Sequence, residues 1–468
     1  MVKNLESFLE EYESIHPNNV VHIDKEIESK WEVTGLAVKI DKIFKEPPIL
    51  IFHKVRTVKG IISEYSSVIN LFASRKRCAF AVGSTFENIG MDVWKKGEIK
   101  KKPVLVAKEE APVKQVIKTG EDIDLFDFPA LVHHAWDPGP YLSAGYLTAY
   151  DPDSGVDNSS IHRGWISGSN EIRFMATHGQ HISIILDKLE TRNEEAKVAY
   201  WVGHHPAACF GIQRPMGFPE SHFEAASGVL GESLRLVPSE TLGDEFLVPA
   251  DAEIVIEGIV PPGKRKPEGP FGEAYGHFGA QRLGRIMQVT GITCRKNAHW
   301  LSMLIGHKDF NVGLGGIQGE GVVFDAVRRA VPTVKTLCRS PSVPAHLYIQ
   351  IKKTLEHQPR TAIISALSSW SSIKHVFVFD EDVDIFDESE IMWAIGSRSQ
   401  WDKDVIIIPR CGASAVDPST DEDELGTKGG IDCTKPAPPK PFEQRLYIPK
   451  NVMDKIDIEY YLPKKEAK

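Results

Sequence analysis

The stretch EIVIEGIVPPGKRKPEGPFGE, residues 253–273, joins a β-strand pattern to a turn that carries two carboxylates. Residues 253–260 are rich in β-branched side chains and predict a strand, which the Pro-Pro-Gly of residues 261–263 ends. Glu268 and Glu273 follow in a segment whose Pro and Gly residues exclude a helix. Turn glycines can bring both acids to one cavity, where aromatic neighbours would raise a carboxyl pKa by excluding water; these neighbours are Phe271, Tyr275 and Phe278. One acid is therefore a candidate proton donor, although a surface turn with scattered acids is the commoner interpretation.

Short strands separated by Gly and Pro turns surround this stretch, from about residue 116 to residue 300. Many short strands at such spacing predict a β-barrel or a sandwich. The expected strands are 141–150, 171–176, 182–186, 197–202, 254–260 and 285–293.

The regions on either side mix helices with strands, as α/β units do. Before residue 115, an amphipathic helix precedes short β-branched runs; its apolar positions are Leu5, Phe8, Leu9 and Tyr12. After residue 301, a helix is expected at 322–331 and strands at 345–351, 375–379 and 405–408. The glycines of residues 313–321 lack the lysine of a P-loop and predict a flexible loop or a plain turn. The Pro-rich tail from residue 436 is a candidate arm for a neighbouring subunit.

The composition of the 468 residues is that of a globular protein, with 42% hydrophobic and 25% charged residues. A net charge of −9 disfavours a sequence-independent nucleic-acid binder, which needs a basic face. The six cysteines form no CxxC pair, so neither a zinc knuckle nor a disulfide framework is expected, and a cytoplasmic location fits. No stretch approaches the roughly 20 apolar residues of a membrane span.

A second group of polar residues precedes the carboxylate turn. Residues 158–163 read NSSIHR, and His178 follows fifteen residues after Arg163. Asn158 and His178, together with a carboxylate, would suit Mn²⁺ or Mg²⁺ better than zinc. The spacing equally allows a structural histidine held by hydrogen bonds, which is the commoner case.

Taken together, these segments resemble the UbiD family of prenylated-FMN-dependent (de)carboxylases. The matching elements run in order along most of the chain: Asp137-Pro-Gly-Pro-Tyr141, Asn158-xxxx-Arg163, His178, Gly203-His-His-Pro-Ala207, 248–258, Glu268-Gly-Pro-Phe-Gly-Glu273, 382–386 with Trp393-Ala, and 426–432. The resemblance implies a modified flavin that accepts the charge left when a C–CO₂ bond breaks, which no side chain can delocalise.

The family's catalytic network falls on Glu273 as proton donor, Arg163 as the group that orients the substrate carboxylate, and Glu268 as its ion-pair partner. The implied metal ion is Mn²⁺ or Mg²⁺, with K⁺ as a further candidate, and its ligands fall on Asn158, His178 and Glu224. Around Glu224 the local spacing departs from the family pattern. The implied flavin contacts are Ile161, His162, Arg163, Arg173, Phe174, Met175, His178 and Gly179, with Lys428 as a partner of the phosphate.

The implied fold is α+β: an N-terminal α/β unit (1–115), a split β-barrel that binds prenylated FMN (116–300), and a C-terminal α/β domain with an oligomerisation tail (301–468). The implied reaction is the reversible, non-oxidative decarboxylation of a phenolic or heteroaromatic acid. A flavin prenyltransferase would supply the cofactor, and the chain would form a homodimer or hexamer. Two other hypotheses remain: an oxidoreductase with unmodified FMN on the same barrel, which would not need the two glutamates, and a non-catalytic assembly subunit.

Overall fold

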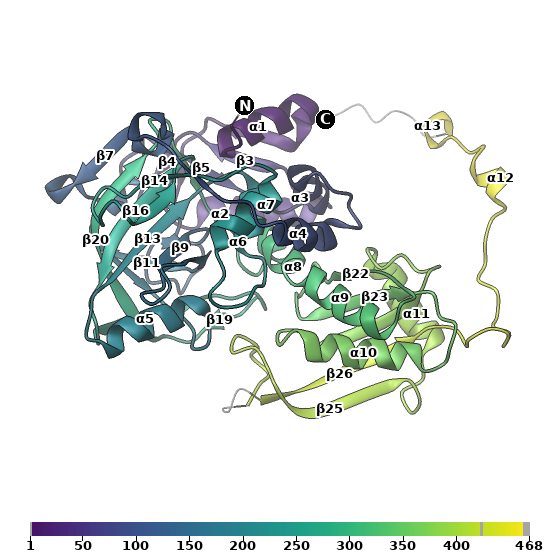
Figure 1. The fold of residues 1–468 in the computed structure, drawn as a ribbon. Helices are drawn as coiled ribbons and strands as arrows, with labels where there is room; N and C mark the ends of the chain where they lie inside the picture. Colours follow the sequence, from purple (N-terminus) through teal and green to yellow (C-terminus); the bar gives the residue numbers. More distant parts are fainter. Residues whose placement is uncertain (1, 422–424, 462–468) are drawn as a thin grey trace.

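A computed structural model describes residues 2–421 and 425–461 of the chain. Figure 1 shows three successive parts: a small sheet with helices, a long curved sheet, and a C-terminal domain with helices around its own sheet. The fold is therefore mixed α+β, as the sequence predicts, with a half-barrel at its centre. The exact boundaries at residues 115 and 300 stay predictions.

The N-terminal part is built on four strands in the order β1 (Val20–Ile23), β3 (Ile49–Phe52), β5 (Ser66–Ile69) and β21 (His299–Leu301). Helix α1 (Leu5–Ile15) begins where the side chain of Asn4 accepts a hydrogen bond from the Ser7 N–H at 2.8 Å. All four apolar residues predicted for this helix are buried. Because β21 comes from the chain that follows the central sheet, the first two parts share one sheet.

Helices from both of these parts form a common layer. α3 (Arg75–Val82) and α4 (Ile89–Glu98) pack against α6 (Pro206–Ile212) and α7 (His222–Leu230), while α2 (Glu32–Ile43) covers the N-terminal sheet. This layer places α7 beside one edge of the central sheet, where it contacts β10 (Asp157–Ile161).

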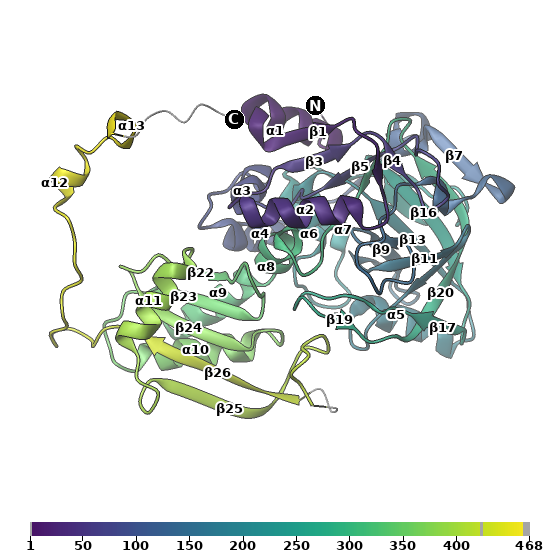
Figure 2. The same ribbon diagram turned by 180° about the vertical axis from the view of Figure 1, so that it is seen from behind.

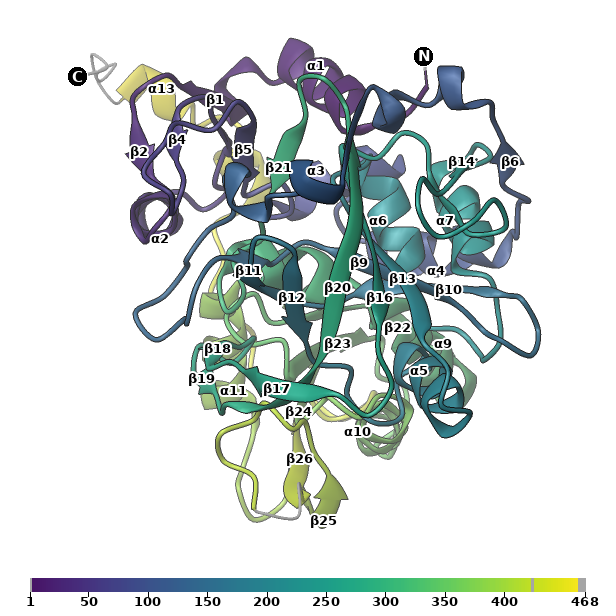
Figure 3. The same ribbon diagram turned by 90° about the vertical axis from the view of Figure 1, so that its left-hand side faces the viewer.

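The central sheet is antiparallel throughout the path from β10 to β8. Figure 3 looks across it, with β12, β20, β16 and β13 next to one another. Its order is β10, β9 (Tyr146–Tyr150), β13 (Ala196–Val202), β16 (Ile254–Val260), β20 (Arg282–Cys294), β12 (Glu171–Phe174), β11 (Gly164–Gly168) and β8 (Tyr141–Leu142), with β17 (Arg265–Glu268) and β7 (Val116–Thr119) also paired to β20. The rings of Trp201 and Tyr146, on neighbouring strands, are buried and stack with their centroids 4.2 Å apart.

One predicted strand of this region is wrong. Residues 182–186 lie in helix α5 (His181–Thr191), and Ile182, Ile185 and Leu186 are buried. Their spacing of three and four residues places them on one face of a helix. This helical period of 3.6 residues decides the structure here, although the β-branched composition favours a strand. The predicted strand 141–150 is two strands, β8 and β9, which lie near opposite ends of the sheet. The other four predicted strands are confirmed, with ends that differ by a few residues.

The glycine-rich segment is also different from its prediction. Residues 309–317 form an irregular helical turn, η6 (Asp309–Leu314), and a short helix, α8 (Gly315–Ile317), which lead into α9 (Glu320–Ala330). A β-carbon at Gly313 would collide with Phe72, and one at Gly315 would collide with Phe310. The glycines therefore serve close helix packing, and the segment is not a flexible loop.

The C-terminal part has a five-stranded sheet with helices on both faces. The order is β22 (Val334–Arg339), β23 (His346–Ile351), β24 (His375–Asp380), β26 (Leu425–Cys433) and β25 (Val405–Gly412), and the three central strands are parallel. α9 and α10 (Gln358–Ser369) pack on one face, and α11 (Glu388–Arg398) on the other. The helix and strands predicted here are confirmed.

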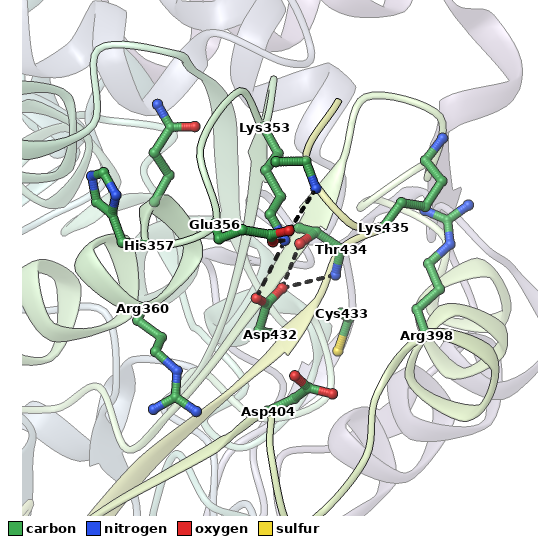
Figure 4. Close-up of polar contacts among 12 residues, drawn as sticks. Lys353, Glu356, His357, Arg360, Arg398, Asp404, Asp432, Cys433, Thr434 and Lys435 are labelled. Atoms are coloured by element: carbon green, nitrogen blue, oxygen red, sulfur yellow. Dashed lines mark hydrogen bonds and ion pairs between the residues drawn. The ribbon is translucent and has the colours of Figure 1, made fainter. Parts of the chain in front are cut away.

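Ion pairs at the carboxyl edge of the parallel strands fix the start of the C-terminal tail. Figure 4 shows Lys353, Glu356 and Asp432 converging there, with Lys353 Nζ 2.9 Å from Glu356 and 3.8 Å from Asp432. Asp432 accepts a hydrogen bond from the Thr434 N–H at 3.0 Å, and Glu356 pairs with Lys440 at 2.9 Å. The tail is thus held at its root by these residues.

Beyond this root the tail stands away from the rest of the chain in both Figure 1 and Figure 2. It carries two short helices, α12 (Lys450–Met453) and α13 (Ile458–Tyr461). Arg445 ties it once more to α11, through two hydrogen bonds to Glu390 at 2.6 and 2.7 Å and a position 3.8 Å above the ring of Trp393. Exposed apolar side chains follow, among them Leu446, Tyr447, Ile448, Met453 and Tyr460.

Within the described ranges, no helix is both long enough and apolar enough to cross a membrane.

Candidate active site

Three residues from separate segments of the central part form one ion-pair network. Arg163 lies between β10 and β11, Glu268 ends β17, and Glu273 follows the short strand β18 (Phe271–Gly272). Arg163 donates from Nε and Nη2 to the two oxygens of Glu268, at 3.0 and 2.9 Å, and from Nη1 to Glu273. The φ of +82° at Gly269 turns the chain directly after Glu268. The structure therefore brings together the three residues predicted to be catalytic.

The two glutamates have different surroundings. Glu268 is fully buried and accepts a further hydrogen bond from the Tyr141 hydroxyl at 3.1 Å. Glu273 retains some access to the cavity, and burial raises its pKa, although the charge of Arg163 acts in the opposite direction. Burial also opposes the charge of Arg163, but Glu268 and Glu273 outweigh it and raise the pKa of the guanidinium. Arg163 is thus a fixed cation and Glu273 the proton-bearing candidate.

The prediction that aromatic neighbours shield Glu273 from water is only partly correct. Phe271 lies under Arg163, with the guanidinium 5.3 Å from the ring centroid. Phe278 is instead 38% exposed and stacks on Trp136. The backbone of Gly279 crowds the carboxylate, since a β-carbon there would lie 2.7 Å from Glu273 Oε1. Shielding therefore comes partly from close backbone, which the sequence pattern does not reveal.

A cavity of about 350 Å³ opens in front of Arg163 and Glu273. Its walls are largely apolar and include Phe271, Met303, Ile305 and Phe310. The C-terminal part contributes Ala415 and Val416, so this cavity lies between the central and C-terminal parts. Of the described residues that line it, Arg163 and Arg282 carry positive charge.

The residues predicted to contact flavin divide into two groups. Ile161, His162, Arg163 and Met175 line the cavity, and His162 is fixed by contacts with Ser160 Oγ at 2.9 Å and the Met175 carbonyl at 3.1 Å. The remaining ones lie elsewhere. Arg173 pairs with Glu171 at 3.0 Å and stacks on Trp165. Phe174 is buried against Tyr200, and His178 and Gly179 lie in an exposed turn. Lys428 donates a hydrogen bond to the Ser371 carbonyl at 2.8 Å.

The sequence did not predict several residues that line this cavity. Thr177 and Gln180 lie in the same segment as Met175, so a wider reading of that segment would have found them. Ser143, Met303 and the pair Ala415 and Val416 come from distant segments. No local pattern marks such residues, because only the packing of the domains brings them to one cavity.

The structure does not bring the three predicted metal ligands together. The Asn158 side chain is buried on β10, whereas the side chain of His178 is 99% exposed. Against Asn158 lies His222, with Asn158 Nδ2 and His222 Nε2 2.8 Å apart. Glu224 is two residues further along α7, and side chains at that spacing point to opposite sides of a helix. Over the ranges that the structure describes, no cluster of three or more His, Cys, Asp or Glu side chains could hold a metal ion.

Three protein-family models match the chain in order. They describe the N-terminal domain (residues 16–95), the Rift-related domain (104–308) and the C-terminal domain (314–433) of 3-octaprenyl-4-hydroxybenzoate carboxy-lyase, UbiD. The anhydromevalonate phosphate decarboxylase of Methanothermobacter thermautotrophicus is 33% identical over 315 residues, which cover 67% of this chain and 73% of that protein. The phenolic acid decarboxylase of Sedimentibacter hydroxybenzoicus is 26% identical over 456 residues, which cover 94% of this chain and 93% of that protein.

Among solved structures, the UbiD-class enzyme HmfF from Pelotomaculum thermopropionicum, in complex with FMN, matches with a TM-score of 0.90. It is 33% identical, and the match covers 98% of this chain and 100% of that one.

Proposed function

The chain belongs to the UbiD family of carboxy-lyases, and from this premise we propose that it decarboxylates a phenolic or heteroaromatic carboxylic acid, reversibly and without oxidation. The observation that carries the proposal is the network of Glu268, Arg163 and Glu273 at the wall of an apolar cavity. A hydride-transfer enzyme would not need this pair of acids.

The cofactor in this proposal is prenylated FMN. When bound, its added ring accepts the electron pair released as the C–CO₂ bond breaks. Four predicted flavin contacts, Ile161, His162, Arg163 and Met175, lie around one cavity, where Ile161 and Met175 offer apolar surface for a flat ring system. The FMN in the HmfF structure supports this assignment. A flavin prenyltransferase would be the partner that supplies the modified cofactor.

The three charged residues divide the work on the substrate. Arg163 would hold the substrate carboxylate through its guanidinium, and Glu268 fixes the orientation of that guanidinium with two hydrogen bonds. After CO₂ leaves, the protonated carboxyl group of Glu273 would give its proton to the carbon that lost CO₂. In the carboxylation direction the Glu273 carboxylate would remove that same proton.

The cavity favours an aromatic acid over a phosphorylated one. Phe271, Phe310 and Met303 offer flat or adaptable apolar surface for a ring. A phosphate group calls for several cationic or N–H donors, whereas the charged donors that line this cavity are Arg163 and Arg282. The similarity to anhydromevalonate phosphate decarboxylase makes that substrate the competing candidate.

A substrate panel tests the proposal directly. Protein produced together with a flavin prenyltransferase is incubated with phenolic acids, furan and pyrrole carboxylates, and anhydromevalonate phosphate, and CO₂ release is measured. We expect turnover of at least one aromatic acid and none with plain FMN in place of the modified cofactor. Turnover of anhydromevalonate phosphate alone would overturn the substrate class, and full turnover with plain FMN would overturn the cofactor.

The remaining assignments are part of the same proposal. A Mn²⁺ or Mg²⁺ ion, with K⁺ as a further candidate, would neutralise the flavin phosphate near Asn158. The predicted contact of Lys428 with that phosphate would require the C-terminal part to move, since its ammonium group is now bound to Ser371. The C-terminal part, residues 301–468, would serve oligomerisation to a dimer or hexamer through its tail.

A further inference from the structure

We infer that Ser143 selects the acid that binds in this cavity, through a hydrogen bond between its hydroxyl group and a hydroxyl group, N–H or oxygen of the aromatic ring. The inference rests on the proposed function and deepens it, because it names the residue that distinguishes a phenolic or heteroaromatic acid from a plain aromatic one. Ser143 contacts the ring in this arrangement, whereas Arg163 holds the carboxylate.

Ser143 directly follows β8 and lies beside two apolar residues of the cavity wall. Its Oγ accepts a hydrogen bond from the Met303 N–H at 3.0 Å. Its other contact is His133, whose ring packs edge-on against Phe271 with centroids 6.0 Å apart. Phe271 and Met303 line the cavity together with Ser143. A ring that lies against these two side chains therefore brings its substituents close to Ser143.

The other uncharged polar side chains of the cavity wall belong to the side with the flavin contacts. Among the described lining residues they are His162, Thr177 and Gln180. Both ring nitrogens of His162 have polar partners, one of them the Met175 carbonyl at 3.1 Å. The Thr177 N–H donates to Gln180 Oε1 at 3.1 Å, and both residues follow Met175 closely in the sequence. Ser143 is thus the neutral polar side chain at the apolar wall.

The hydroxyl group of Ser143 can form one hydrogen bond more than it forms within the described residues. A serine hydroxyl has one donor and two acceptor positions. The Met303 N–H occupies one acceptor position, and His133 Nε2, 3.0 Å from Oγ, occupies a second position. The third is available to a ligand in the cavity.

His133 decides whether this third position donates or accepts. Burial lowers the pKa of His133 to about 3, so its ring is neutral and carries one proton. Nδ1 of the ring lies 3.1 Å from Thr34 Oγ1 on α2, a hydroxyl group that can donate or accept. With the proton on Nε2, His133 donates to Ser143, and the hydroxyl hydrogen of Ser143 is left for an oxygen of the ligand. With the proton on Nδ1, Ser143 donates to Nε2 and accepts from an N–H or O–H of the ligand.

Ligand binding to the full chain loaded with FMN tests the inference without turnover. Two matched pairs of acids are titrated and followed by flavin fluorescence: 3,4-dihydroxybenzoate against benzoate, and pyrrole-2-carboxylate against thiophene-2-carboxylate. We expect the wild type to prefer the first acid of each pair. S143A should bind that acid about fivefold more weakly, or worse, and bind the second acid within about twofold of the wild type. An equal preference in S143A and the wild type, or no preference in the wild type, would overturn the inference.

Two further variants make the result specific. T177V alters another polar residue of the same cavity and should keep the wild-type preference, and an equal loss in T177V would overturn the special role of Ser143. S143C keeps the test valid if S143A folds poorly once the Met303 N–H loses its partner. Its thiol has nearly the same shape but bonds more weakly, so the preference of S143C should lie between those of the wild type and S143A.

Flavin content and CO₂ release separate this inference from its alternatives. Lower flavin content in S143A with an unchanged preference between the acids would place Ser143 against the cofactor and overturn the inference. A preference that is lost in S143A, combined with no CO₂ release from any aromatic acid in the wild type, would uphold the role of Ser143 in binding and overturn the proposed reaction.

Discussion

Glu273 is held by Arg163, which donates a hydrogen bond to its Oε1, and the backbone of Gly279 lies close to the same oxygen. Replacement by Gln keeps the shape but removes the acidic proton. We expect Glu273→Gln to retain the flavin and to lose on the order of a hundredfold or more in decarboxylation rate. The measurement is kcat together with the flavin absorbance of the purified protein.

An exchange experiment provides the control for this variant. With product in D₂O, the wild type should place deuterium at the former carboxyl position, and Glu273→Gln should not. Exchange at the wild-type rate in fully loaded Glu273→Gln would identify another residue as the acid, with Glu268 the first to examine.

The raised pKa of Glu273 also fixes the direction of the pH profile. Burial favours the protonated carboxyl group, so the proton-donating form survives to higher pH than in an ordinary glutamate. The decarboxylation rate should fall as the pH rises through this pKa and be steady below it. The profile of kcat against pH should show this fall at high pH in the wild type and lack it in Glu273→Gln. The same fall in both proteins would assign it to another titrating group.

Gly279 offers a test that leaves every charged residue in place. A β-carbon there would lie 2.7 Å from Glu273 Oε1 and 3.0 Å from its Cγ, so Gly279→Ala must displace the acid from Arg163. We expect normal thermal stability within about 1 kcal/mol, retained flavin and at least a tenfold lower kcat. Gly276→Ala, three residues earlier and with open space at the β-carbon, is the comparison for backbone strain without displacement of the acid, since Gly276 has a φ of +74°. Unchanged kcat in Gly279→Ala would show that the acid tolerates the displacement.

Sequence motifs predicted the three charged residues because their types and order are local features of the chain. The positions of the predicted metal ligands were harder to predict, since which side of α7 faces β10 depends on how Asp157 holds Ser221 and Phe223 at the start of that helix. A shift of two residues, from Glu224 to His222, reverses the direction in which a helical side chain points. Sequence spacing cannot supply that rotation where the local pattern departs from the family.

At the scale of elements, one buried ion pair joins helices from two parts of the chain. Arg75 on α3 donates from Nη1 and Nη2 to the two oxygens of Glu320 at the start of α9, at 2.8 and 2.7 Å. Both side chains are nearly inaccessible. Removing one partner leaves a buried charge, so Glu320→Gln should cost about 3–5 kcal/mol of stability.

The midpoint of thermal unfolding, compared with that of Asp325→Asn, measures this effect. Asp325 lies on the same helix and pairs with the exposed Arg328 and Arg329, at 3.5 and 2.6 Å. Exposed pairs of this type contribute about 0.5 kcal/mol. If both variants unfold at the same temperature, the buried pair has no special role in joining the two parts.

Helix α5 shows how far the elements themselves can be predicted. The run of residues 182–186 has the composition of a strand, yet its buried positions repeat with the period of a helix. Strands β13 and β16 are almost continuously buried, and their β-branched runs bounded by turn residues were sufficient to predict them. Helical packing of the glycines at 313–316 was not predictable, because it depends on Phe72 and Phe310, which meet them only in the folded chain.

For the whole molecule, the tail predicts how copies of the chain associate. Its exposed apolar residues include Phe442 and the run directly after Arg445, the residue that binds Glu390 on α11. Ending the chain after Pro441 should leave a folded protein of lower oligomeric order, because the root contacts of Lys353 and Glu356 remain. Light scattering measures the mass. An unchanged number of subunits in the shortened protein would place the interface on another surface.

Ala415 and Val416 line the cavity from the C-terminal domain, whereas Glu268, Glu273 and Arg163 all belong to the central part of the chain. Part of the cavity wall therefore lies in a separate stretch of the chain from the acids and Arg163, so mutation there can reshape the cavity while the network stays in place. A lineage could acquire a larger or smaller ring as substrate by changing two small side chains in the C-terminal domain, while Glu273 and Arg163 stay as they are. Exchanging that domain between relatives is, by the same reasoning, a route to new specificities from one inherited chemistry.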